Sequence, residues 1–277
     1  MKFDIFPSSF HSIIVPTIDT VRNDWIIHKL IKFRCHVMTT GETGTGKSVA
    51  VKRMMLEDLS PDRYRPLFLT YSAQTTAFQT QGIIDNKLDK RRRGVFGPPI
   101  GKICIIFVDD LNMPMPEVYG AQPPIELIRQ HMGQGGWYDR KALEYRAIID
   151  CTYIGSMGPP GGGRNPMSER AKRKFNIISY VEMDDTSKAM IFETILSSYL
   201  MDKFQDEVKG TVSELVLGAI DLYNAVLKQM LPTPAKSHYT FNLRDLSKVF
   251  QGVCSGSPDR LKAVSYTHLT LPTNREV

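Results

Sequence analysis

A glycine-rich octapeptide is the part of the sequence with the clearest capacity for chemistry. It consists of Gly41, Glu42, Thr43, Gly44, Thr45, Gly46, Lys47 and Ser48, and it matches the phosphate-binding pattern GxxxxGK[ST]. The glycines let the backbone curl so that several N–H groups point at one phosphate. Lys47 would add a cation for the β- and γ-phosphates, and the Ser48 hydroxyl could ligate Mg²⁺. The octapeptide therefore predicts a magnesium–nucleotide site, with a chance glycine-rich turn as the alternative.

Two adjacent acids further along the chain complement this loop. Asp109 and Asp110 follow the unbroken apolar run Ile103–Val108, which is typical of a strand buried on both faces. In phosphate-loop proteins the first acid of such a strand holds the metal, usually through water, and we expect Asp109 to do so. Asp110 is then placed to act as a general base toward the attacking water. The alternative is that the two acids only cap a turn.

The elements around these motifs alternate between strands and helices. Strands are expected at residues 37–40, 66–71, 103–108, 148–156 and 175–181, and helices at 20–33, 48–59, 75–90 and 124–132. The Arg/Gly/Pro-rich stretch that ends at Gly101 is expected to be an exposed loop, and Gly135–Arg140 a tight turn or hairpin. Such alternation predicts an α/β fold in which helices flank a parallel sheet.

From Ser187 onward the pattern becomes purely helical, with helices expected at residues 187–203, 211–230 and 242–254. The predicted organisation is an N-terminal loop and helix (1–36), a large α/β subdomain with the phosphate loop (37–186) and a small all-helical lid (187–263). Residues 264–277 have no helical period and no partner element. We interpret them as a non-native tail and leave them out of the fold prediction.

Composition places few further constraints. The 277 residues are 42% hydrophobic and 23% charged, as in an ordinary globular protein, and no apolar run or N-terminal signal suggests a membrane or secreted protein. The four cysteines form no CxxC pair and the six histidines show no metal-ligand spacing, so we expect reduced thiols and no structural zinc. The net charge of +6 comes partly from two basic clusters, at 89–93 and 170–174. For the first cluster, a solvated loop or helix face is favoured over a nucleic-acid surface.

Several further segments resemble one family, the dynein heavy chains, over nearly all of the chain from Val15 to about Pro258. The matching segments are VPTIDTVR (15–22), the phosphate loop GETGTGKS, FVDDLNMP (107–114), YGAQPPIELIRQ (119–130), GGWYDRK (135–141), GPPGGGRNP (158–166) and HYTFNLRDLSKVFQG (238–252). The resemblance implies one AAA+ P-loop NTPase module, most similar to the third unit of the six-unit motor ring. FVDDLNMP and GPPGGGRNP resemble the axonemal classes more than the cytoplasmic class.

The resemblance implies roles for individual positions. The segment that flanks the adenine is matched by Val15, Pro16 and Thr17. Arg244 matches the sensor-II arginine of the lid, which reaches the γ-phosphate of its own site. Arg170 matches the arginine finger, which is offered to the nucleotide of a neighbouring unit, and Arg173 is the second candidate. A solvated helix charge is the alternative for Arg170.

Three departures from the family pattern bear on turnover. Asp110 stands where an AAA+ ATPase typically carries Glu, Gly158 stands at the sensor-I position that is usually Asn, and Ala171 replaces the Phe that follows the finger. A shorter base and a missing water-orienting side chain should slow hydrolysis but leave binding intact. We therefore expect a regulatory site that binds ATP with Mg²⁺ tightly, with weak ATPase activity only in the full ring.

The resemblance also implies partners and a location. The expected partners are neighbouring AAA+ modules of the same heavy chain, microtubules through the intact motor, and dynein intermediate and light chains, with no nucleic acid and no membrane. The expected locations are the cytoplasm, the cytoskeleton and the ciliary axoneme. Two other hypotheses remain open: a nucleic-acid-remodelling AAA+ ATPase that uses the two basic clusters, and a scaffold that nucleotide only stabilises. The chain has no sustained heptad pattern and no second phosphate loop, so we do not expect it to be a motor alone.

Overall fold

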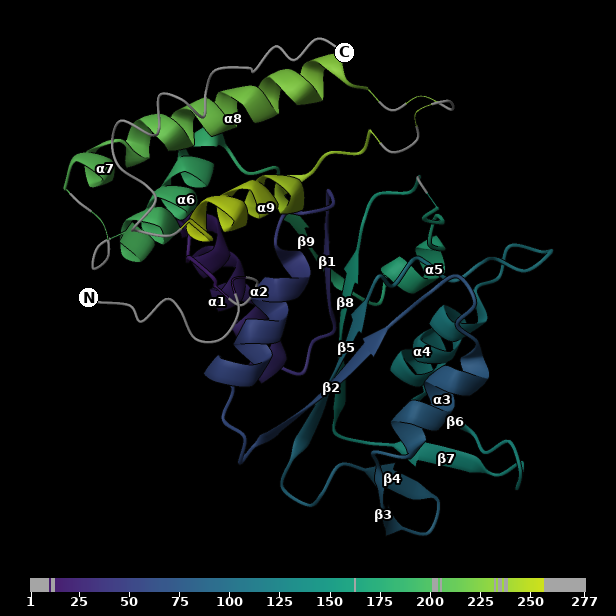
Figure 1. Ribbon diagram of the computed structural model, residues 1–277. Helices are drawn as coiled ribbons and strands as arrows, with labels where there is room; N and C mark the ends of the chain where they lie inside the picture. Colours follow the sequence, from purple (N-terminus) through teal and green to yellow (C-terminus); the bar gives the residue numbers. More distant parts are fainter. Residues whose placement is uncertain are drawn as a thin grey trace. The chain divides into compact units, whose positions relative to one another are not determined.

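The computed structural model describes residues 10, 13–161, 163–200, 204, 206–231, 233, 236 and 239–256. The chain divides into two compact units, one formed by residues 19–182 and the other by residues 1–18 together with 183–277 (Figure 1). Residues 264–277, interpreted above as a tail, lie outside the described residues. Among the described helices, none has the combination of length and apolar character needed to cross a bilayer.

A five-stranded parallel sheet forms the centre of the larger unit. Its strands are β1 (Val37–Gly41), β2 (Tyr64–Thr70), β5 (Ile103–Asp109), β8 (Cys151–Met157) and β9 (Asn176–Tyr180), in the order β2-β5-β8-β1-β9. Every pairing is parallel, and every residue of β5 is buried. The unbroken apolar run at 103–108 thus predicted a doubly covered central strand correctly.

Helices cover both faces of this sheet (Figure 1). They are α1 (Ile18–Lys32), α2 (Lys47–Arg53, continued by a π-helical turn Met54–Asp58), α3 (Ala77–Asp85), α4 (Pro123–Gln134) and the short α5 (Glu169–Lys172). Side chains alternate along β5: Ile105 and Phe107 pack with α1 and α2, whereas Ile106 and Val108 pack with α3 and α4. The two faces therefore carry separate hydrophobic cores.

A second, four-stranded sheet departs from the sequence-based expectation. It contains β3 (Asp89–Arg92), β4 (Val95–Gly97), β6 (Gly136–Tyr138) and β7 (Tyr145–Ile148), in the order β3-β4-β7-β6. The helix expected at 75–90 ends at Asp85, and part of the expected loop before Gly101 is the β3–β4 hairpin. The expected hairpin after Gly135 is confirmed, since β6 pairs antiparallel with β7.

The buried strand expected at 148–156 is confirmed from Cys151 onward as β8, but its start is wrong, because the chain turns a corner between β7 and β8. Asp150 adopts a left-handed φ of 56° there, and its carboxylate pairs with Arg34 at 2.7 Å. A residue with positive φ breaks an extended strand, although the apolar pattern continues through it.

The smaller unit is helical, as predicted, and contains α6 (Asp185–Leu200), α7 (Asp206–Gly210), α8 (Val212–Gln229) and α9 (Leu243–Cys254). The sequence analysis did not identify α7. Phe192 of α6 stacks on Phe250 of α9 with ring centroids 4.2 Å apart, and Val216 of α8 lies in the same core. A capping box starts α9, with Asn242 accepting from the Arg244 N–H at 2.8 Å.

Candidate nucleotide site

The phosphate loop connects β1 to α2 at the carboxyl edge of the sheet, where parallel α/β folds bind ligands. Gly44 and Gly46 adopt left-handed φ values of 92° and 80°, which glycine reaches without strain. At Gly41 the requirement is space, because an added Cβ would lie 2.3 Å from the Tyr180 carbonyl oxygen on β9. The glycines of the octapeptide thus give the loop its curl and its close fit against the sheet.

Lys47 lies inside this loop with 8% of its surface exposed. Its Nζ donates to the carbonyl oxygens of Gly41 (2.8 Å) and Glu42 and to the Thr45 hydroxyl (3.2 Å). Burial lowers the pKa of Lys47, and the nearby Arg164 lowers it further. A phosphate group at the loop would compensate this poorly solvated cation.

Ser48 and Asp109, the two predicted magnesium residues, lie in direct contact. The Ser48 hydroxyl donates to Asp109 Oδ1 at 2.5 Å, and the ammonium of Lys52 lies 3.1 Å from Oδ2. The strand end thus presents a carboxylate that already holds a cation, beside a hydroxyl oxygen. Hard oxygen donors of this kind suit Mg²⁺, which in such sites takes its other ligands from phosphate and water. The pair therefore fits the ion, although no group of three or more His, Cys, Asp or Glu residues that could hold a metal occurs in the described part of the chain.

Asp110, the candidate general base, has an unusual backbone and a partner. Its φ is 51°, in the left-handed region that aspartate tolerates better than most residues. One of its carboxylate oxygens lies 3.3 Å from Nη2 of Arg164. Non-glycine residues in this region concentrate at functional sites, and here the turn lifts the second acid out of the strand.

Arg164 is a site residue that the sequence analysis missed. Besides pairing with Asp110, its Nη1 donates to the Thr43 hydroxyl of the phosphate loop at 3.1 Å. The guanidinium therefore bridges the two motifs that the sequence identified separately. The available signal was the single arginine within the breaker run GPPGGGRNP, but a breaker run gives no indication of where its side chains point.

Comparison with known proteins identifies the family. A family model described as "P-loop containing dynein motor region" matches residues 6–183, and one described as "AAA+ lid domain" matches residues 215–271. The chain belongs to the P-loop dynein motor family. Its fold is accordingly an AAA+ P-loop domain with a parallel sheet flanked by helices and a C-terminal helical lid, as predicted.

Several relatives of this dynein module are axonemal heavy chains. It is 48% identical to dynein axonemal heavy chain 1 of Rattus norvegicus over 275 residues, which are 95% of the module and 6% of that protein. It is 48% identical to dynein axonemal heavy chain 12 of Homo sapiens over 241 residues (87% and 8%) and 44% identical to human dynein axonemal heavy chain 6 over 253 residues (91% and 6%). The module spans only about 6–8% of the length of these relatives.

Four of the remaining predicted site residues of the dynein module belong to the smaller, helical unit. Val15 packs against the core of the helical unit, followed by the exposed Pro16 and the buried Thr17. Arg244 is exposed in the first turn of α9 in the same unit, so its role at the γ-phosphate stays a prediction.

The two arginine-finger candidates lie at α5 of the larger unit. Arg170 and Arg173 are both exposed, and neither forms an ion pair within the described residues. Ala171 between them is fully buried in the core that α3 and α4 share. The two arginines are thus free to face outward, and their role at a neighbouring nucleotide remains a prediction.

The first basic cluster of the module (89–93) is solvent-exposed apart from the half-buried Arg91, as expected, but it lies on strand β3 and the following turn rather than on a loop or helix face. Arg91 lies in β3, donates to the Pro98 carbonyl oxygen at 2.7 Å and faces the Asp150 carboxylate at 3.6 Å. A strand in a small mixed sheet is stabilised by such contacts rather than by its own hydrophobicity. The cysteines agree with expectation, since all four are free, and Cys104 and Cys151 are paired residues on β5 and β8.

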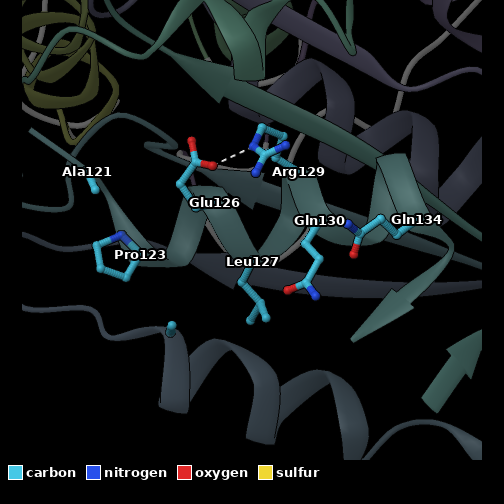
Figure 2. A pocket seen from close by; sticks show the side chains of 8 residues that line it. Ala121, Pro123, Glu126, Leu127, Arg129, Gln130 and Gln134 are labelled. Atoms are coloured by element: carbon cyan, nitrogen blue, oxygen red, sulfur yellow. Dashed lines mark hydrogen bonds and ion pairs between the residues drawn. The ribbon is translucent and has the colours of Figure 1, made fainter. Parts of the chain in front are cut away.

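A pocket of about 450 Å³ lies beside α3 and α4 of the module (Figure 2). Leu127 and Gln130 point into it from α4, and Glu126 and Arg129 form an ion pair on the same helix. The residues that line it are Ala77, Ala121, Pro123, Glu126, Leu127, Arg129, Gln130 and Gln134, none of which belongs to the phosphate loop or the strand-end acids. Since its charged side chains pair with each other, the pocket presents no uncompensated group to a ligand.

Proposed function

We propose that this module is a regulatory nucleotide unit of an axonemal dynein heavy chain, which binds ATP with Mg²⁺ tightly and hydrolyses it slowly. The observation that carries the proposal is the contact between Ser48 and Asp109 next to the buried Lys47. These three groups come from the phosphate loop and the strand end, and together they form what a magnesium–triphosphate complex needs from the protein.

Binding is supported by each part of the site. Loop amides and the start of α2 favour an anion, and Lys47 can exchange its loop carbonyl oxygens for phosphate oxygens. When bound, Mg²⁺ would neutralise phosphate charge, with Ser48 and Asp109 as the residues that hold it. The ammonium of Lys52 would then give up one oxygen of Asp109.

Slow hydrolysis is supported by the state of Asp110. A general base needs a free carboxylate oxygen within reach of the water it activates. Asp110 is one methylene shorter than glutamate, so its carboxylate reaches less far toward that water. Gly158 supplies no side chain that could orient water instead. The residues of the site therefore support ATP binding better than ATP hydrolysis.

The family and the exposed arginines support a proposed ring context. In a heavy chain, Arg170 or Arg173 would serve the nucleotide of a neighbouring unit, and Arg244 on the lid would respond to the γ-phosphate of this one. We assign the module to the third unit of the ring. Microtubules would be engaged through the intact motor, with intermediate and light chains as partners, in the cytoskeleton of the ciliary axoneme.

Calorimetry on the full chain tests binding. ATP and ADP should bind in a magnesium-dependent manner, and Lys47→Ala should abolish binding, whereas Lys32→Ala, which removes an exposed lysine of α1, should leave it unchanged. If the folded chain takes up neither nucleotide, the proposal is refuted.

Single-turnover hydrolysis by the assembled ring tests the regulatory role. We expect slow cleavage at this site and a measurable effect of Lys47→Ala on motility. Fast cleavage that disappears in Asp110→Asn would show a fully catalytic unit instead.

A further inference from the structure

The missing side chain at Gly158 creates the space that the Arg164 guanidinium occupies. A Cβ built on Gly158 would lie 2.8 Å from Nε, 2.9 Å from Cδ and 3.0 Å from Cζ of Arg164. Real Cβ atoms essentially never approach heavy atoms more closely than 3.0 Å. Any residue larger than glycine at this position would therefore push the guanidinium away. Glycine at position 158 removes the polar side chain expected there, and it also leaves the space that the Arg164 guanidinium needs.

The loop that carries Arg164 is held at both ends. At one end, the buried Asn112 donates to the Gly158 carbonyl oxygen at 2.9 Å. At the other end, the Asn165 N–H donates to the Asn112 carbonyl oxygen at 3.0 Å, and its side chain donates to the Pro114 carbonyl oxygen at 3.0 Å. The segment after Asp110 thus fixes the loop that returns the arginine to Asp110.

A turn inside the loop fixes Arg164 itself. Gly161 and Arg164 exchange two backbone hydrogen bonds, each of 3.0 Å. A backbone closed in this way and anchored on both sides fixes where the side chain of Arg164 begins, and the contacts with Thr43 and Asp110 hold its guanidinium. The position of the guanidinium is a product of this framework.

The guanidinium lies beside the phosphate loop and has donors to spare. It uses Nη1 for Thr43 and Nη2 for Asp110, while its buried Nε has no hydrogen-bond partner among the described residues. Arginine carries five N–H donors in a planar fork that matches phosphate oxygens. The positive charge of Arg164 contributes to lowering the pKa of Lys47, which lies in the phosphate loop. Two cations facing one loop form a site for a highly charged anion.

We propose that Arg164 reads the γ-phosphate of the nucleotide in its own module, in place of the side chain that Gly158 lacks. The proposal rests on the proposed nucleotide binding and adds the residue that separates ATP from ADP. The guanidinium exchanges Thr43 and Asp110 for an oxygen of the terminal phosphate. In the same step Asp110 is released from its ion pair. ADP offers no γ-phosphate oxygen, so Arg164 stays on Asp110.

The test compares the affinities of the full chain for ADP and for a non-hydrolysable ATP analogue, adenylyl imidodiphosphate, both with Mg²⁺. Arg164→Gln should weaken binding of the analogue by on the order of tenfold, since a charge-assisted hydrogen bond is lost, and should leave ADP binding within about twofold. Arg164→Lys keeps the charge but loses the planar fork of donors, so its affinity for the analogue should lie between those of the wild type and Arg164→Gln. The matched control is Arg93→Gln, which removes an exposed arginine and should change neither affinity.

Gly158→Asn provides a second, independent variant. Its new side chain should displace the guanidinium and reproduce the selective loss of analogue binding without touching Arg164. The proposal is overturned if Arg164→Gln weakens both nucleotides equally, if it weakens neither, or if folded Gly158→Asn keeps the full preference for the analogue. A wild-type chain that binds neither nucleotide would instead refute the proposed function and the inference with it. Thermal unfolding without nucleotide shows that each variant is folded.

Discussion

The protein should lose stability between pH 7 and pH 5, and replacing His36 by glutamine should abolish most of this loss. His36 lies immediately before β1, and its Nδ1 accepts a hydrogen bond from the Tyr153 N–H on β8 at 3.1 Å. Its ring also lies against those of Tyr153 and Phe175, with centroids 5.6 and 6.5 Å away. Protonation at Nδ1 would set two N–H groups against each other. The fold therefore requires the neutral ring.

The sign and size of the effect follow from the pKa. Burial lowers the pKa of His36 from 6.5 to about 4, with smaller contributions from His131 and Lys174. Between these values the unfolded chain holds more protons than the folded one, so the free energy of unfolding decreases as the pH falls from about 6.5 toward about 4. Applied between pH 7 and pH 5, this linkage gives a loss of about 2 kcal/mol at most. Above about pH 7 the ionisation of His36 no longer changes the free energy of unfolding.

Urea unfolding followed by tryptophan fluorescence measures this loss, because Trp137 is buried in the same unit and changes its environment on unfolding. The informative quantity is the difference between His36→Gln and wild type at each pH, since other groups contribute equally to both. Burial also lowers the pKa of His131, which leaves a remaining slope of the same sign. His28→Gln, at an exposed position of α1, is the matched control and should follow the wild type. If the wild type and His36→Gln lose stability in parallel, the reasoning is refuted.

Two further predictions concern the framework of the site. Arg53→Met should destabilise the protein by about 3–5 kcal/mol, because the largely buried Asp24 carboxylate, 2.6 Å from the guanidinium, would lose its cation. In thermal unfolding, the double variant with Asp24→Leu should recover most of this loss. Gly41→Ala should abolish nucleotide binding and lower the unfolding midpoint, because its Cβ would clash with the Tyr180 carbonyl oxygen. Gly82→Ala, in open space on α3, is the control for that change and should stabilise the helix by about 0.5–1 kcal/mol; an equal loss in both glycine variants would contradict the clash.

The sequence predicted the elements whose signal is local. The continuous apolar run of β5 and the glycine pattern of the phosphate loop each follow from the residues themselves, and both were located correctly. The small second sheet was missed because its stability is not local. β3 is the charged segment Asp89–Arg92, and it becomes a strand only through its pairing with β4 and the contacts of Arg91. The corner at Asp150 was missed because a single left-handed residue leaves the apolar pattern intact.

The candidate site was also predicted only in part, because the sequence identified the residues of its two motifs but not Arg164. Ser48 and Asp109 come into contact as expected, with Lys47 in the same loop. The carboxyl ends of parallel strands meet at one edge of the sheet, and this brings the two residues together although β8 lies between β1 and β5. Arg164 could not be found from spacing, since its position depends on an empty volume at Gly158 and on hydrogen bonds made by Asn112. We had interpreted Gly158 only as a lost function. The structure gives that glycine a steric role that no pattern of residue types contains.

The ion pair between Arg164 and Asp110 links recognition to turnover. While the guanidinium holds the carboxylate, the base is occupied, and the left-handed backbone of Asp110 limits how far the acid can move away. A ligand that attracts Arg164 more strongly than Asp110 does would free the base, and a γ-phosphate is such a ligand because it carries more charge than one carboxylate. Even then the freed acid is an aspartate without the reach of a glutamate. The ion pair thus favours ATP over ADP, and the short side chain of Asp110 keeps cleavage slow. These are the two properties by which a unit can hold a nucleotide state while other units turn over.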